Sequence, residues 1–239
     1  MQLDTDDNAP RLLLSWSSGK DSCWALHRLL QESSVRVVGL LTTFNGHFQR
    51  SAIHGVRMPL LRLQAAAIGL PLIEVALPWP CDNQQYERLM AEALASVRQS
   101  LQIQVLAFGD LYLEDIRRYR ERQMADLDLA LHFPLWQLPT APLAQQMLDG
   151  GLRAKVTCLD PKVVPKELAG SEYNRDFLRA LPESVDPCGE NGEFHTFVYD
   201  APMFAAPLSI TPGETVERDG FVYTDFFPTD FLPKEGLCG

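Results

Sequence analysis

At residues 12–22 the chain reads Leu12-Leu13-Leu14-Ser15-Trp16-Ser17-Ser18-Gly19-Lys20-Asp21-Ser22. The apolar run over residues 11–16 predicts a buried strand, and residues 21–30 have the pattern of a helix. Small residues between a strand and a helix let the backbone approach an anion closely. The free N–H groups of the helix and about half a positive charge from its dipole then face that anion. This stretch therefore predicts a phosphate-binding loop.

Beyond this loop, short apolar runs alternate with helical patterns. Strands are predicted at residues 35–44, 72–77 and 105–108, and helices at residues 59–68, 84–101 and 113–127. Such alternation with short connections predicts an α/β fold, a HUP or Rossmann-like parallel sheet covered by helices on both faces. Ligands bind such sheets at the carboxyl ends of the strands, where the strand order reverses. The loops after Trp16, Phe44 and Phe108 are therefore the places to expect a site.

The pattern changes after about residue 131, where prolines become frequent. A helix is predicted at residues 143–148, and strands at residues 154–159, 197–199, 208–210 and 221–227. Asp219-Gly220 is typical of a hairpin turn. We expect a disordered tail over residues 1–10, a nucleotide-binding domain over 11–130, and a smaller C-terminal α+β substrate-binding region over 131–239.

Composition narrows the function classes. The 239 residues include 21 Lys and Arg against 31 Asp and Glu, a net charge of −10. A chain this acidic has no general attraction for nucleic acid or anionic membranes. The five cysteines are scattered without a C-x-x-C pair, which fits a reducing compartment. Neither a signal peptide nor an apolar run long enough to span a bilayer is evident, so we expect a cytoplasmic protein that binds neither nucleic acid nor a membrane.

The first loop is not a Walker P-loop, because Leu14 stands where that motif has its first glycine and Asp21 follows Lys20. Serine hydroxyls would donate hydrogen bonds to phosphate, Lys20 would add charge and act in catalysis, and Asp21 would place Mg²⁺. The predicted nucleotide ligands are Ser15, Ser17, Ser18, Gly19, Lys20, Asp21, Ser22, His54, Gly109 and Asp110. Turn and helix-cap roles would explain the serines and Asp21, but not Lys20. A loop histidine without a role and a helix cap explain His54 and Asp110 equally well.

A second polar cluster lies at Asp186-Pro187-Cys188-Gly189-Glu190-Asn191-Gly192-Glu193-Phe194-His195-Thr196-Phe197. Glu190 and Glu193 are candidates to hold ammonium or to act as general bases, and His195 is a candidate to relay a proton. The predicted catalytic residues are Lys20, Glu190, Glu193 and His195. The predicted substrate ligands are Glu190, Asn191, Gly192, Glu193, His195 and Thr196. A solvated turn followed by a core histidine explains this composition equally well.

The two segments together resemble known enzymes. Residues 17–22 resemble the Ser-Gly-Gly-x-Asp-Ser loop of PP-loop ATP pyrophosphatases, with Ser18 in place of the middle glycine. Residues 189–196, followed by Asp200-Ala201-Pro202-Met203-Phe204, resemble the signature of the diphthine–ammonia ligase family, PP-loop ATP-binding proteins of the adenine nucleotide alpha hydrolase superfamily.

This resemblance implies a HUP-type fold, ATP and Mg²⁺ as cofactors, and amide formation. A carboxylic acid would be adenylated, pyrophosphate released, and AMP then displaced by ammonia. The implied partners are ATP, ammonia and an acid substrate, carried on a protein such as elongation factor 2, with a homodimer as one candidate assembly.

Two alternatives stay open. One is another PP-loop enzyme, a tRNA-modifying ligase or thiolase, which the acidic charge and the scattered cysteines disfavour. The other is a non-catalytic nucleotide-binding regulator, for which the second polar cluster would be superfluous.

Overall fold

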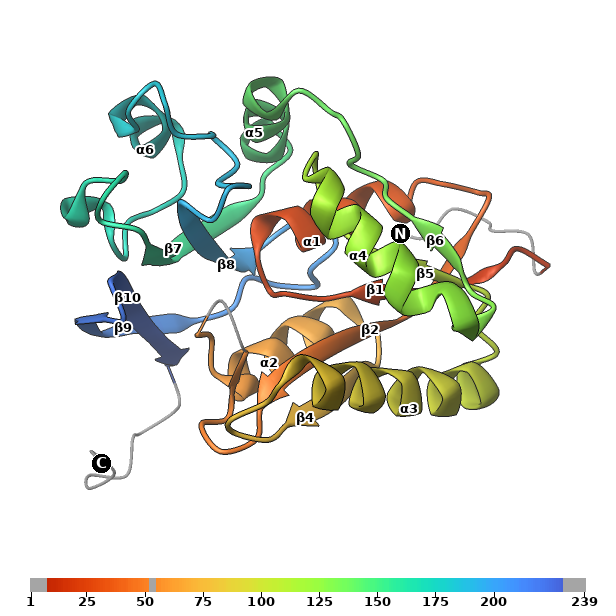
Figure 1. The fold of residues 1–239 in the computed structure, drawn as a ribbon. Coiled ribbons are helices and arrows are strands. Elements are labelled where there is room, and N and C mark those ends of the chain that lie inside the picture. Colours follow the sequence, from red (N-terminus) through yellow and green to blue (C-terminus); the bar gives the residue numbers. More distant parts are fainter. Residues whose placement is uncertain (1–7, 52–54, 230–239) are drawn as a thin grey trace.

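The computed structural model describes residues 8–51 and 55–229. Its first sheet follows the apolar runs of the amino-terminal half (Figure 1). The strands are β1 (Arg11–Ser15), β2 (Arg36–Asn45), β3 (Arg50–Ser51), β4 (Leu72–Leu77), β5 (Val105–Ala107) and β6 (Ala130–His132). All pairings are parallel except that of the two-residue β3 with β2.

The order of these strands reverses beside β1. From β1 the chain builds β2 and then β4 on one side, and it later returns to place β5 and β6 on the other side. The carboxyl ends of β1 and β5 are therefore neighbours at the reversal, where sheets of this type bind ligands.

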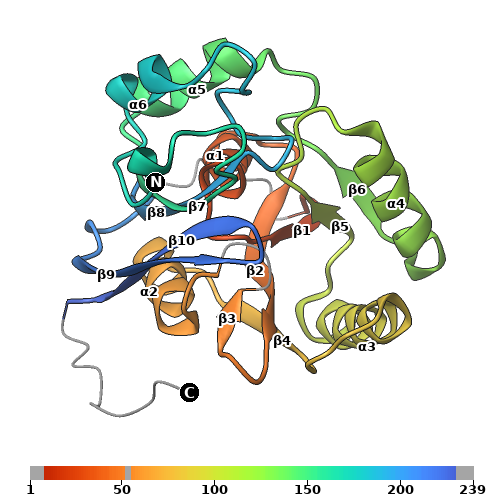
Figure 2. The same ribbon diagram turned by 60° about the vertical axis from the view of Figure 1, so that its left-hand side comes forward.

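Helices cover both faces of this sheet because β1 is apolar on both sides. Leu12 and Leu14 face a core shared with α1 (Lys20–Leu29) and α2 (Met58–Ile68). Leu13 faces a second core with α3 (Asn83–Leu101) and α4 (Glu114–Met124). Figure 2 shows α1 and α2 on one side of the sheet and α3 and α4 on the other.

The carboxyl-terminal half forms an antiparallel sheet in the order β8-β7-β10-β9. Its hairpin turns at Asp219 and Gly220, whose φ angles of 53° and 83° are those that a two-residue turn of this type requires. The elements of this half are α5 (Thr140–Asp149), β7 (Arg153–Leu159), the 3-10 turn η2 (Lys166–Leu168), α6 (Arg175–Ala180), β8 (Phe194–Asp200), β9 (Ile210–Arg218) and β10 (Phe221–Pro228).

The two sheets share a hydrophobic core. Phe197 and Val198 of β8 and Val156 of β7 belong to the same buried cluster as Leu12 and Leu14 of β1. Figures 1 and 2 accordingly show β7 and β8 beside α1, next to the carboxyl end of β1. The second half is thus packed onto the first.

The predicted α/β fold, with helices on both faces and a smaller C-terminal α+β region, is confirmed. Three details differ from the sequence prediction. The helix expected at residues 113–127 is α4 followed by the 3-10 turn η1 (Ala125–Leu127), the strand expected at 208–210 begins only at Ile210, and β3, β6 and α6 were not predicted. Of the expected tail, residues 1–7 lie outside the described residues, and Ala9 is buried. In the described part of the chain, every helix is too short or too polar to cross a membrane.

Candidate active site

A cavity of about 260 Å³ lies at the carboxyl ends of β1 and β5, and residues of both halves line it. Among the predicted site residues, the lining comprises Ser15, Ser17, Lys20, Asp21, Ser22, Gly109, Asp110, Glu190, Gly192, His195 and Thr196. Ser18, Gly19, Asn191 and Glu193 lie in the same two loops without lining the cavity, and His54 lies outside the described residues. The structure therefore brings together two segments that are about 170 residues apart in the sequence.

Strand β8 holds the phosphate loop by direct hydrogen bonds. The backbone N–H of Lys20 donates to Thr196 Oγ1 at 3.1 Å, and the N–H of Val198 donates to the carbonyl of Ser18 at 3.0 Å. The carbonyl of Ser18 also accepts from the Gln64 side chain of α2 at 3.0 Å. Two distant segments, β8 and α2, thus fix the path of this loop.

The amino end of α1 lies at the cavity. Its N-cap is Gly19, which has no side chain to cap the first turn, and the N–H of Lys20 is bonded to Thr196 Oγ1 of β8. Gly109, after β5, lies against this turn: a Cβ there would be 2.9 Å from the Ser22 nitrogen and 3.0 Å from the Asp21 carbonyl carbon. Glycine at this position lets the two loops approach each other.

Ser18 has an unfavourable environment for a serine. Its φ angle is +73°, a left-handed conformation that costs a residue with a Cβ about 1–2 kcal/mol. Its hydroxyl is buried and has no hydrogen-bond partner among the described residues. A glycine at this position would avoid both costs.

Lys20 is buried between the two halves of the protein. Only 2% of its side chain is exposed, and its ammonium group lies 2.8 Å from Asp21 Oδ2 and donates to the carbonyl of Cys188. The rings of Tyr173 and Phe194 flank it at 5.8 and 5.4 Å. Burial lowers the pKa of Lys20, but the neighbouring negative groups, Asp21 foremost, together outweigh it, and the pKa is raised overall. Lys20 therefore stays charged and joins the two loops.

Asp21 offers a ligand for a cation. Its Oδ2 binds Lys20, whereas its Oδ1 is buried without a hydrogen-bond partner in the part of the chain that the structure describes. Burial raises the pKa of Asp21 and Lys20 opposes this shift. No cluster of three acidic, His or Cys side chains forms among the described residues. One free carboxylate oxygen fits Mg²⁺, which takes one or two carboxylates and completes its shell with phosphate and water.

Glu193 closes the loop of residues 186–193 on itself. The side chain is 7% exposed. Its Oε1 accepts from the N–H of Asp186 at 3.1 Å and from Asn191 Nδ2 at 3.0 Å, and its Oε2 accepts from the N–H of Asn191 at 2.9 Å. This carboxylate is thus occupied by hydrogen bonds within its own loop.

Glu190 faces the cavity. Its Oε1 accepts backbone N–H groups of Leu111 at 2.7 Å and Tyr112 at 3.4 Å. Burial raises the pKa of Glu190 to about 7, and the nearby charges of Asp21 and Asp110 add to the shift. A carboxyl group with this pKa can both release and accept a proton near neutral pH.

Comparison with known proteins identifies the family of this chain. The sequence model of the diphthamide synthase N-terminal domain matches residues 11–129, and that of the diphthamide synthase C-terminal domain matches residues 140–225. The chain belongs to the diphthamide synthase family.

Its curated relatives include the diphthine–ammonia ligase of Danio rerio, 29% identical over 90% of this chain and 91% of that protein. The enzyme of Rattus norvegicus is 28% identical over 92% and 89% of the two chains, and that of Homo sapiens is 27% identical over 84% and 82%.

Three residues at the candidate site, Tyr112, Arg120 and Asp186, are not among the predicted ligands and catalytic residues. Asp186 accepts the N–H groups of Cys188 and Glu190 at 3.2 and 3.0 Å, and Tyr112 donates to it at 3.4 Å. Arg120 lines the cavity, binds Asp110 through two hydrogen bonds of 2.5 and 3.0 Å, and lies 4.3 Å above the ring of Phe108. Arg120 belongs to the basic run of residues 117–122, an observable signal in an acidic chain. The pattern does not say which arginine faces the site.

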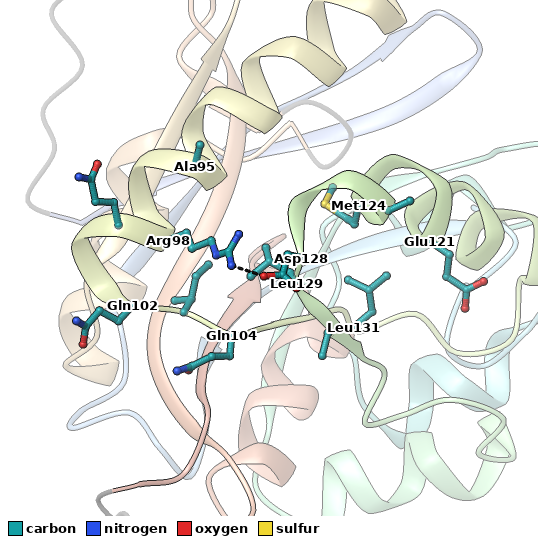
Figure 3. Close-up of a pocket in the computed structure, with 13 residues that line it drawn as sticks. Ala95, Arg98, Gln102, Gln104, Glu121, Met124, Asp128, Leu129 and Leu131 are labelled. Atoms are coloured by element: carbon teal, nitrogen blue, oxygen red, sulfur yellow. Dashed lines mark hydrogen bonds and ion pairs between the residues drawn. The ribbon is translucent and has the colours of Figure 1, made fainter.

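A larger hollow lies elsewhere. An open groove of about 1290 Å³ lies between α3 on one side and α4, η1 and β6 on the other. Figure 3 shows its lining residues, with the ion pair of Arg98 and Asp128 among them. The groove includes Gln104 and Leu129, which precede β5 and β6, so it lies at the amino ends of these strands. None of the predicted site residues lines it, and the candidate site is at the other end of the sheet.

Proposed function

We propose that this chain is an ATP-dependent carboxylate–ammonia ligase of the diphthine–ammonia ligase type, which forms AMP and pyrophosphate. The observation that carries this proposal is the single cavity formed by the phosphate loop and the loop of residues 186–193. An enzyme that activates an acid with ATP and then transfers ammonia to it needs both sites within reach of one carbon atom.

In this proposal, residues 11–130 bind the nucleotide. The N–H groups at the start of α1 and the hydroxyls of Ser17 and Ser22 would bind the phosphates, and Asp21 Oδ1 would help to hold Mg²⁺. The acid oxygen attacks the α-phosphorus, and the bond to pyrophosphate breaks. Donors aimed at the departing pyrophosphate stabilise its charge, usually the largest contribution to catalysis of this kind.

Residues 131–239 provide the second step. Ammonia attacks the activated carbonyl, AMP leaves, and Glu190 takes the proton that the nitrogen loses. Glu190 suits this role because it faces the cavity and its pKa is raised to about 7 by burial. His195 and Thr196 line the same cavity and would contact the acid.

The finer assignments are part of the same proposal. We propose that the acid is carried on a protein such as elongation factor 2, that the protein acts in the cytoplasm, and that a homodimer is a candidate assembly. The net charge of −10 supports a partner other than nucleic acid.

The proposed function is tested by incubating the protein with ATP, Mg²⁺, ammonium and a set of candidate carboxylic acids. We expect AMP and pyrophosphate in equal amounts, only when acid and ammonium are both present. Acid-dependent exchange of labelled pyrophosphate into ATP would identify the acid. Release of ADP and phosphate would reject the scheme, and nucleotide binding without turnover with any acid would favour a regulator.

A further inference from the structure

We propose that Gln64 is a positioning residue of the phosphate loop. Its side-chain amide fixes the peptide group between Ser18 and Gly19, so that the Gly19 N–H is directed to Ser17 Oγ, and Ser17 lines the cavity. The inference rests on the proposed function only in that the ligand used to test it is ATP.

Gln64 lies on α2 and is fully buried, and its hydrogen bonds reach the phosphate loop and β8. Its Oε1 accepts the indole N–H of Trp16 at 2.9 Å. Its Nε2 donates to the carbonyl of Ser18 at 3.0 Å and to that of Val198 at 2.6 Å. One amide thus bonds to both ends of the Trp16–Ser18 segment and to β8.

These bonds set the direction of a neighbouring N–H group. Gln64 Nε2 and the Val198 N–H both donate to the Ser18 carbonyl, which therefore points into the protein. In a trans peptide the N–H points opposite to the carbonyl. The Gly19 N–H is accordingly directed to Ser17 Oγ, 3.3 Å away, and Ser17 lines the cavity.

The loop needs this support because its own residues do not favour the conformation. Ser18 is held at φ +73°, and its buried hydroxyl forms no hydrogen bond within the described part of the chain. The bonds to its carbonyl are therefore what opposes relaxation of the loop. Only an amide side chain supplies one acceptor and two donors here. Leucine would leave two buried carbonyls and an indole N–H with fewer partners, and a carboxylate would face two carbonyl oxygens.

A purely structural role for Gln64 predicts a different outcome. If the amide only stabilised the core, its loss would lower stability, and ATP affinity would fall no more than in any equally destabilised variant. If it positions the loop, ATP affinity falls specifically. A glycine at position 18, which adopts a positive φ without strain, should then restore much of that affinity.

The experiment compares Gln64→Leu, the isosteric Gln64→Glu, the double variant Gln64→Leu/Ser18→Gly, and Leu60→Ala as a control. Leu60 lies on the same helix and is buried, and the small cavity that it lines includes none of residues 15–22. Calorimetric titration with ATP and Mg²⁺, and with inorganic pyrophosphate, gives affinities, and thermal melting gives stability. We expect about a tenfold loss of affinity in both single Gln64 variants, equivalent to one oriented bond to phosphate. The Leu60→Ala variant should stay within about twofold of wild type, and the double variant should recover most of the loss.

Three results would each overturn the proposal. They are wild-type ligand affinity in the Gln64 variants, an equal loss of affinity in Leu60→Ala, and no recovery of affinity in the double variant. If wild-type protein binds neither probe, the proposed function fails. The orientation of the Gly19 N–H is then judged by its amide hydrogen exchange, which must be faster in Gln64→Glu than in wild type if the inference holds.

Discussion

At Glu190, burial and hydrogen bonding act on the pKa in opposite directions. The N–H groups of Leu111 and Tyr112 stabilise the carboxylate, but burial and the charges of Asp21 and Asp110 outweigh them, and the pKa is raised to about 7. The folded state therefore favours the neutral form. As the pH rises from 4.5, the ordinary value, through 7, the unfolded chain loses its proton first, and the folded state loses stability.

Glu190→Gln should abolish amide formation and still stabilise the protein at pH 8. Glutamine keeps an oxygen for the two N–H groups and never ionises. After a discount for partial exposure, the free energy of unfolding at pH 8 rises by about 1 kcal/mol. This raises Tm by about 2–4 °C at pH 8 and leaves it unchanged at pH 4. Melting curves at both pH values and amide formation measure this, with the exposed Glu92→Gln as control. A wild-type rate of amide formation in the Glu190→Gln variant would exclude Glu190 as the base.

Lys20→Ala should abolish nucleotide turnover. The change removes the charge beside Asp21, the bond to the Cys188 carbonyl and the contacts with two aromatic rings. The loss is measured as AMP release at saturating ATP. Arg28→Ala, at the other end of α1, serves as the control and should keep its activity. Turnover comparable to wild type in Lys20→Ala would show that neither charge nor the link between the loops is needed.

At the scale of elements, the proposed transfer of ammonia depends on the loop of residues 186–193 keeping one conformation. Glu193 holds it with hydrogen bonds to Asp186 and Asn191, and Asp186 holds the N–H groups of Cys188 and Glu190. A short loop with two glycines needs such bonds to keep one conformation.

Glu193→Ala should leave nucleotide binding intact and stop amide formation. The first loop keeps its bonds to β8 and Gln64, whereas Glu190 loses its fixed position because the loop around it opens. ATP titration and amide formation are measured on the same preparation. Glu183→Ala, an exposed residue upstream, is the control. Simultaneous loss of binding and amide formation would mean that the loop supports the whole fold.

The elements that sequence patterns predict best are those with continuous apolar runs. The strand expected at 72–77 is β4, and the helix expected at 84–101 is α3 with one more residue, because Asp82 caps it with Gln85. Strand β9 was predicted only in part, through the strand expected at 208–210 and the hairpin turn at Asp219-Gly220. It contains Pro212 and Gly213 and is mostly exposed, so that its pairing with β10 defines it. Tertiary pairing is not visible in local pattern.

The same reasoning applies to the candidate site. The two loops were recognised because each concentrates polar and small residues. Gln64 was not, because a glutamine in a helical pattern is ordinary and only its contacts with Trp16, Ser18 and Val198 distinguish it. The roles of Glu190, Glu193 and His195 stay predictions.

At the scale of the whole molecule, a cluster of charged side chains joins the two sheets beside their shared core. Asp225 of β10 binds Arg50 of β3 at 2.8 Å and Arg57, before α2, at 2.6 Å. Burial raises the pKa of Asp225, but the hydrogen bonds from the two arginines outweigh it, and the pKa is lowered overall. A depressed carboxyl pKa stabilises the fold above the unfolded value of 3.8, and this contribution is lost as the pH falls through the lower folded pKa.

Asp225→Asn should therefore lower Tm at pH 7 and have a smaller effect in strong acid. Two arginines are left without their charged partner. Such a loss lowers the free energy of unfolding by about 3–5 kcal/mol for fully buried pairs, and by less for this partly exposed one. Thermal melting from pH 7 down to pH 3 measures the difference. The exposed pair partner Asp176→Asn serves as the control. If the Tm difference between wild type and Asp225→Asn does not depend on pH, the carboxylate charge contributes nothing to stability.

The setting of Lys20 restricts how this protein can be divided or recombined. Tyr173, Phe194 and Cys188, which enclose its ammonium group, all come from the carboxyl-terminal half. A fragment ending near residue 130 would expose this lysine to water and release Ser18 from β8. In a chimera of two relatives, the aromatic pair must therefore be exchanged together with the loop that it encloses.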